Sequence, residues 1–223
     1  MCVSYLFFDL DGTLADSSEG ILGALSFSLR QMGLPVPGRQ TLTRFIGPPL
    51  ARSFSEDFAL SPADTQRAIS FFHEYYSTAG RLQCRLYNGI RELLRSALDC
   101  GYRLAVATCK PQAMADAMLG RLEIDGFFDV ICGPEDDSVR TEKHEVIAHV
   151  MQALRLSDPR AIRMIGDRRD DVLGAARNGV SCLGALWGFG SEKELRTAGA
   201  ERCFRTPQEL SAHLQKQPPF HEN

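Results

Sequence analysis

Apolar runs of strand length alternate with amphipathic stretches through most of the chain after Tyr87. The near-continuous apolar runs lie at residues 103–108, 127–132, 161–166 and 181–187, as expected for parallel strands that are covered on both faces. Helical spacing of apolar residues predicts helices between them, near residues 90–98, 111–122, 143–155 and 171–178. This alternation predicts an α/β fold with a doubly wound parallel sheet.

A long helical interval separates the first predicted strand, residues 4–9, from the strand at 103–108. One helix is predicted to end at Gly33, because apolar residues before it share one face: Ile21, Leu22, Leu25, Leu29 and Met32. Another is predicted from Ser61-Pro62 to near Gly80. We therefore expect an α/β core of residues 1–15 and 86–215, an inserted all-helical cap domain of residues 16–85, and a loose tail of residues 216–223.

Composition and charge narrow the classes of function. With 44% hydrophobic residues over 223 positions, the chain can bury a substantial core. The net charge of −3 comes without a Lys/Arg block, so neither a nucleic acid nor a membrane surface is an expected partner. No apolar segment approaches the roughly 20 residues of a membrane span, and the N-terminal stretch lacks the features of a signal peptide. The seven cysteines form no C-x-x-C pair, and we expect a reducing, cytoplasmic location.

Acidic residues follow the predicted strands. Asp9 and Asp11 end the first strand, Asp167 ends the strand at 161–166, and Asp171 lies four positions further on. The carboxyl ends of parallel strands meet at one edge of a sheet, so these carboxylates are expected to converge and to repel one another unless a cation lies among them. Oxygen ligands suit Mg²⁺, and Gly12 permits a sharp turn that presents backbone N–H groups to an anion such as phosphate.

Four motifs occur in a fixed order: "DLDGTLADS", "VATCKP", "RTEKHEVI" and "IGDRRDDVLGAARNG". Together they resemble the haloacid dehalogenase superfamily, in particular its phosphoglycolate phosphatase-like branch, which includes nucleotide and pyrophosphate phosphatases. The resemblance covers nearly the whole chain. It implies a Rossmann-like core with a helical cap inserted after the first motif, and a phosphatase activity that depends on Mg²⁺ and passes through an aspartyl-phosphate.

The resemblance also implies roles for the matched positions. Asp9 corresponds to the nucleophile, and Asp11 to the general acid/base, whose main-chain carbonyl also reaches the metal. The groups that hold the phosphoryl oxygens correspond to Thr108 and Lys143, with Gly12 as a backbone contributor. The Mg²⁺ site is expected to comprise Asp9, Asp11, Asp167 and Asp171.

Weaker candidates lie beside these positions. Lys110, in the Thr-x-Lys-Pro stretch, is a candidate for contact with phosphate or for a structural role, and Gly47 and Arg52 in the insertion are candidate substrate contacts. Cys109 has no evident His partner and is expected to pack rather than to react. Asp170 is expected to be a solvated charge beside Arg169, although it lies one position from Asp171.

Other functions remain open at this point. Dehalogenases of the superfamily generally lack the second aspartate, so Asp11 favours a phosphatase. A phosphomutase of the same superfamily is one alternative, and a non-catalytic protein-binding module is another. The expected partner is a small phosphorylated metabolite, either phosphoglycolate or a nucleoside 5′-monophosphate, and the oligomeric state stays open between monomer and dimer.

Overall fold

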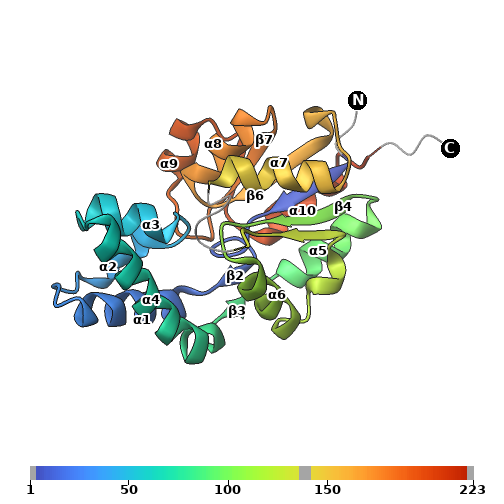
Figure 1. Ribbon diagram of the computed structural model, residues 1–223. Coiled ribbons are helices and arrows are strands. Elements are labelled where there is room, and N and C mark those ends of the chain that lie inside the picture. The colour runs from blue at the N-terminus through green and yellow to red at the C-terminus, as the bar shows by residue number, and fades with distance from the viewer. Residues whose placement is uncertain (1–3, 136–141, 220–223) are drawn as a thin grey trace.

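A six-stranded parallel sheet forms the centre of the protein (Figure 1), in a computed structural model that describes residues 4–135 and 142–219. The strand order is β5-β4-β1-β6-β7-β8, and every neighbouring pair is parallel. The chain runs from β1 outward to β4 and β5 and then returns to β6 on the other side of β1, so the sheet reverses its order beside β1. The strands are β1 (Tyr5–Phe8), β4 (Arg103–Ala107), β5 (Val130–Cys132), β6 (Ile162–Gly166), β7 (Ser181–Ala185) and β8 (Arg202–Phe204).

Helices cover both faces of the sheet, and the central strand supplies apolar side chains to both. Leu6 and Phe8 of β1 join one buried cluster, and Phe7 joins the other, because successive side chains of a strand point to opposite faces. The first cluster includes residues of α5 (Ile90–Asp99), α6 (Gln112–Arg121) and α10 (Pro207–Gln215). The second includes residues of α7 (Lys143–Ala153), α8 (Arg169–Arg177) and α9 (Glu192–Ala198).

The cap consists of the helices between the two strands of a short antiparallel ribbon, in which β2 (Ala15–Asp16) pairs with β3 (Arg85–Leu86). Helix α1 (Ser18–Gln31) packs along α4 (Pro62–Thr78), and α2 (Arg39–Leu42) and α3 (Leu50–Arg52) lie nearby (Figure 1). Ser61 caps α4 by accepting a hydrogen bond from the N–H of Asp64 at 3.2 Å. Gly33, after α1, has a φ of +70°, which glycine adopts without strain.

The predicted doubly wound sheet and the inserted helices are confirmed, whereas the domain boundaries stay a prediction. The apolar run at residues 127–132 is a strand only from Val130, because Asp125–Phe127 forms a 3₁₀ turn in which Phe127 N–H bonds the Ile124 carbonyl. The strand predicted to reach residue 187 ends at Ala185. The helix predicted from residue 171 begins at Arg169, and β8 and the ribbon were not predicted. Within the described ranges, none of the helices has the length and apolar character to cross a bilayer.

Candidate active site

The sheet brings the predicted acidic residues together. Asp9 follows β1 and Asp167 follows β6, and these strands are neighbours, so both side chains emerge at the same edge. Asp171 joins them from the first turn of α8. Carboxylate oxygens of Asp9, Asp167 and Asp171 all lie within 4.8 Å of one another, and all three residues are buried. The predicted convergence at the strand ends is present for these three carboxylates, whereas the Asp11 carboxylate, expected among them, is bound by Ser17 and Lys110 instead.

Lys143 holds this carboxylate cluster. Its ammonium group lies 2.7 Å from Asp9 Oδ1 and 2.8 Å from Asp171 Oδ1, and it donates a hydrogen bond to the Ala107 carbonyl at 3.0 Å. The side chain is only 4% exposed, because Lys143 is the first residue of α7 and α7 packs on the sheet. Three buried carboxylates against one ammonium leave an excess of negative charge that favours a bound cation.

Asp167 is fixed by neighbours on both sides. Oδ1 accepts a hydrogen bond from the Thr13 hydroxyl at 3.1 Å, and Oδ2 accepts one from the Phe189 N–H at 2.8 Å. Gly12 has a φ of +87°, and a Cβ added there would lie 2.4 Å from Asp167 Oδ2. Gly188 is equally constrained, because its added Cβ would lie 2.4 Å from Asp167 Cβ. Glycine is therefore required at both positions for the loops to close around Asp167.

Burial and charge shift the titration of these groups. Burial is the largest influence on Asp9 and, against the opposing charge of Lys143, raises the pKa of Asp9 to about 6. Burial, reinforced by the charges of Asp171 and Asp9, raises the pKa of Asp167 well above its ordinary value. Burial alone lowers the pKa of Lys143, yet the carboxylates of Asp171 and Asp9 raise it well above its ordinary value. The ammonium therefore stays charged at neutral pH.

The donor set of the cluster fits a hard divalent cation. Mg²⁺ binds oxygen ligands and is held in proteins by one or two carboxylates together with substrate oxygens and water. Asp9, Asp167 and Asp171 supply carboxylate oxygens only, and a divalent cation would offset their mutual repulsion. The cluster is therefore compatible with a bound Mg²⁺ ion.

Asp11 turns toward the cap instead of the cluster. Its carboxylate accepts hydrogen bonds from Ser17 Oγ at 2.5 Å and from Lys110 Nζ at 2.9 Å. Lys110 is buried, and its ammonium lies 4.6 Å from the centre of the Tyr76 ring of α4. The backbone N–H of Lys110 also bonds Thr108 Oγ1 at 3.2 Å. The two aspartates of the first motif thus face different surroundings, although one residue separates them.

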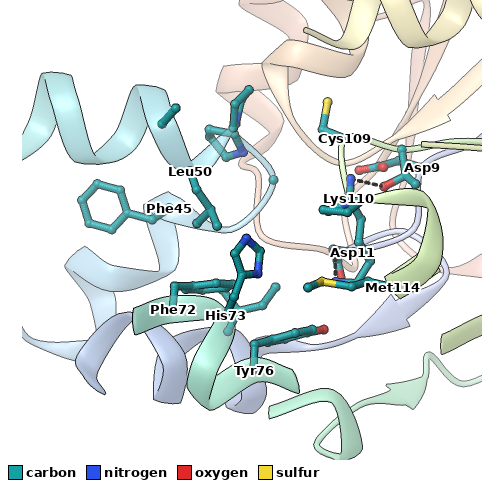
Figure 2. A pocket seen from close by; sticks show the side chains of 17 residues that line it. Asp9, Asp11, Phe45, Leu50, Phe72, His73, Tyr76, Cys109, Lys110 and Met114 are labelled. Atoms are coloured by element: carbon teal, nitrogen blue, oxygen red, sulfur yellow. Dashed lines mark hydrogen bonds and ion pairs between the residues drawn. The ribbon is translucent and has the colours of Figure 1, made fainter. Parts of the chain in front are cut away.

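A cavity lies between the sheet edge and the cap (Figure 2). Asp9, Asp11 and Thr108 line its core side. The cap side is apolar and aromatic, and includes Phe45, Leu50, Phe72, His73 and Tyr76. Gly47, a candidate from the sequence, also lines the cavity.

Arg52 lies away from the cavity lining and joins the cap to the core. Its guanidinium is 2.5 Å from Asp170 Oδ2 and 3.7 Å from Glu142. Asp170 therefore pairs with Arg52 across the domains. The prediction that Asp170 is a solvated charge beside Arg169 was wrong. Arg168 adds to this junction by donating to the Ile46 carbonyl of the cap at 2.7 Å. The candidate contact of Arg52 with substrate stays a prediction.

Several residues at the site were not identified from the sequence. The loop after β7 provides the Phe189 N–H to Asp167, and the Trp187 indole donates to the Thr13 carbonyl at 2.9 Å. The sequence "WGFG" alternates aromatic residues with glycines, and the two glycines let the backbone approach Asp167 closely. Cys109 lines the cavity, and burial raises the pKa of its thiol to about 12, so it stays neutral and is a poor nucleophile at pH 7.

Comparison with known proteins identifies the family. The model of the haloacid dehalogenase-like hydrolases matches residues 6–185. A 5′-nucleotidase of Pseudomonas aeruginosa is 40% identical over 191 residues, 86% of either chain. The tyrosine-protein kinase PtkA of Mycobacterium tuberculosis is 37% identical over 184 residues, 82% of this chain and 62% of that protein. The crystal structure of a predicted phosphatase from Clostridium acetobutylicum superposes with a TM-score of 0.93 and 35% identity, covering 97% of this chain and 100% of that one.

The chain belongs to the haloacid dehalogenase-like hydrolases. Within that family it is a phosphatase-type enzyme, a phosphoric monoester hydrolase. The resemblance stated on the four motifs is confirmed, and so is the fold class. The roles of the individual site residues stay predictions.

Proposed function

We propose that the protein is a Mg²⁺-dependent phosphatase that hydrolyses small phosphomonoesters through an aspartyl-phosphate on Asp9. The observation that carries the proposal is the buried contact of Lys143 with Asp9 at 2.7 Å, beside the Asp167 and Asp171 carboxylates. A carboxylate at a strand end, with an ammonium against it and a candidate cation site next to it, suits attack on an anionic phosphoryl group.

The first step forms the covalent intermediate. An oxygen of the Asp9 carboxylate attacks phosphorus, the bond from phosphorus to the leaving oxygen breaks, and that oxygen takes a proton from the Asp11 carboxyl. Thr108 and Lys143 orient the phosphoryl group, and Lys143 offsets its negative charge. Bound Mg²⁺ would supply further charge neutralisation on the phosphoryl oxygens.

The second step regenerates the enzyme. Asp11, now a carboxylate, takes a proton from a water molecule as the water oxygen attacks phosphorus, and the bond from phosphorus to Asp9 breaks. Inorganic phosphate leaves, and Asp11 is again protonated for the next turnover. Hydrolysis of a phosphate monoester needs accelerations of up to about 10²¹-fold, so nucleophile, acid/base and charge neutralisation must act together.

The wall of the cavity favours a nucleoside 5′-monophosphate over phosphoglycolate. The phosphoglycolate carboxylate needs a cationic partner beyond the phosphate site. Lys110 is the one Lys or Arg among the described residues that line the cavity, and it is already paired with Asp11. The aromatic side chains of Phe45 and Phe72 suit the flat face of a base instead.

Phosphate release tests the proposal directly. Wild-type protein should liberate inorganic phosphate from nucleoside 5′-monophosphates with Mg²⁺. The release of phosphate should stop when EDTA is added. Asp9→Asn should lower kcat by at least about 10⁴-fold, as expected for loss of a nucleophile. Asp116→Asn, on the exposed side of α6, is the matched control and should keep wild-type activity.

The rival functions give different results in the same assay. A phosphomutase would move label between positions of a sugar phosphate without releasing phosphate. A binding module would release no phosphate from any ester, and a kinase of the PtkA type would label a tyrosine from ATP. Any of these results without ester hydrolysis would overturn the phosphatase proposal.

A further inference from the structure

Two donors from different parts of the chain fix the carboxylate of Asp11. Ser17, directly before α1, donates its hydroxyl to Oδ1, and Lys110, in the loop after β4, places Nζ 2.9 Å from Oδ2 and 3.3 Å from Oδ1. The side chain of Lys110 is 6% exposed and that of Asp11 is 12% exposed. Because the pair is almost free of water, the direction of the carboxylate is set by these contacts.

Tyr76 of the cap covers this pair. The Lys110 ammonium lies 4.6 Å from the centre of the Tyr76 ring, a distance at which the ring face attracts a cation. Tyr76 is 2% exposed and stacks on Phe72, with ring centres 5.5 Å apart and planes 11° apart. Figure 2 shows the ring beneath Asp11 on the cap side of the cavity. Movement of the cap away from the sheet would remove the ring and expose the pair to water.

Lys110 and Lys143 therefore serve different carboxylates. Lys143 contacts Asp9 and Asp171 within the cluster, where a phosphoryl group would be transferred. Lys110 contacts Asp11, which faces the cavity from the side of the cap and the leaving group. In the first step Asp11 loses a proton and becomes an anion, and an adjacent ammonium stabilises that anion.

We propose that Lys110 is a positioning residue for Asp11, and that Tyr76 completes this positioning only while the cap covers the sheet edge. This inference rests on the phosphatase function proposed above. Transfer of the proton to the leaving oxygen is then linked to closure of the cap. The role differs from contact with the phosphate, for which Lys110 was a candidate from the sequence.

The test compares two esters that differ in their need for an acid. Phenyl phosphate has a poor leaving group that needs a proton, and 2,4-dinitrophenyl phosphate has a good one that leaves without it. Lys110→Met should lower kcat/KM for phenyl phosphate at least about tenfold more than for the dinitrophenyl ester, since acid catalysis contributes about 10²–10⁴-fold. The value of kcat/KM is measured because it reports the step that expels the leaving group.

Matched variants separate positioning from other roles. Lys143→Met, which removes the ammonium beside Asp9 and leaves the one beside Asp11, should lower kcat/KM for both esters by the same factor. Lys110→Arg keeps the positive charge and should bring the ratio of kcat/KM for the two esters most of the way back to the wild-type ratio. Tyr76→Leu should also lower kcat/KM more for phenyl phosphate than for the dinitrophenyl ester, but by a smaller factor than Lys110→Met. Tyr76→Phe should keep the wild-type ratio of the two kcat/KM values. The double variant of Lys110→Met and Tyr76→Leu should lose little beyond Lys110→Met alone.

The outcomes are distinct. An equal loss on both esters for Lys110→Met, or a change in KM alone, would overturn the positioning role and make Lys110 a phosphate or substrate contact. Full additivity of Lys110→Met and Tyr76→Leu would overturn the link to the cap. Failure of the proposed function itself would look different, because wild-type protein would then hydrolyse neither ester, or Asp11→Asn would leave the contrast between the esters unchanged.

Discussion

The core wall and the cap wall of the cavity are held by opposite kinds of interaction. On the core wall, Lys143 lies 2.7 Å from Asp9 and 2.8 Å from Asp171, and all three are buried. On the cap wall, Phe45 and Phe72 contribute apolar surface without fixed polar partners. Buried charges depend on exact partners, whereas apolar surface tolerates exchange of similar volumes. Under the proposed function, the core wall would fix the chemistry and the cap wall would set the choice of substrate.

The largest effect is expected from breaking the core wall at Lys143. Lys143→Met leaves Asp9 and Asp171 without their ammonium, so kcat should fall by about 10³-fold, the scale of losing one stabiliser of transition-state charge. The metal-free protein should also lose about 3–5 kcal/mol of unfolding free energy, as for a broken buried pair. Phosphate release and chemical denaturation measure the two effects. A variant with wild-type kcat would contradict the role of Lys143.

Exchange of an aromatic ring on the cap wall should act on binding alone. Phe45→Leu keeps an apolar side chain but removes a ring face that does not stack on Tyr76, so KM for a nucleoside 5′-monophosphate should rise about fivefold to 150-fold, corresponding to about 1–3 kcal/mol of base stacking. The kcat value should change little, and so should KM for ribose 5-phosphate, which lacks a base. Equal changes in KM for both substrates would show that the cap wall does not bind a base.

The effect of Mg²⁺ on the stability of the core wall should depend on pH. The pKa of Asp9 is raised to about 6 in the fold against an ordinary value of 3.8, so its ionisation as pH rises destabilises the metal-free protein. Mg²⁺ should offset that cost, and its affinity should weaken up to about tenfold per pH unit below pH 6, where a proton competes for Asp9. The rise in Tm with Mg²⁺ over EDTA should therefore be larger at pH 7.5 than at pH 5. An equal rise at both pH values, or in Asp9→Asn, would exclude this explanation.

The smallest effect is expected at the junction between the two walls. Arg52 is about one-third exposed in its pair with Asp170, and such pairs contribute about 0–1 kcal/mol. Arg52→Ala should change kcat/KM by no more than about threefold at low salt and less at high salt. Asp170→Asn should have the same effect, and the double variant should add nothing. A large loss with Arg52→Ala alone would support the earlier expectation that Arg52 contacts substrate.

The sequence was most informative about the core wall. Acidic residues at the ends of apolar runs predicted the convergence of Asp9, Asp167 and Asp171, because parallel strands end at one edge. Gly12 was expected to make a turn, although its closeness to Asp167 appears only once β1 and β6 are side by side. The charged core wall was therefore predictable from local pattern and strand order.

The cap wall was not predictable in the same way. Phe72 and Tyr76 follow the same helical pattern as residues that only pack in the interior, and Phe45 lies in a short 3₁₀ turn. No local signal separates a lining residue from a core residue. The pairs between Arg52 and Asp170 and between Lys110 and Asp11 join segments about a hundred positions apart. Such contacts depend on how the cap rests on the sheet, which a pattern along the chain does not record.

The short ribbon of β2 and β3 carries both crossings of the chain between core and cap, with Ala15 opposite Leu86 and Asp16 opposite Arg85. Since the entry and exit points are adjacent, the helical segment forms a cassette whose replacement leaves the order of the six central strands intact. A different set of helices joined at this ribbon would meet the same aspartates. Exchange of the cap at residues 16 and 85 is accordingly a direct way to test new substrate specificities on an unchanged α/β core.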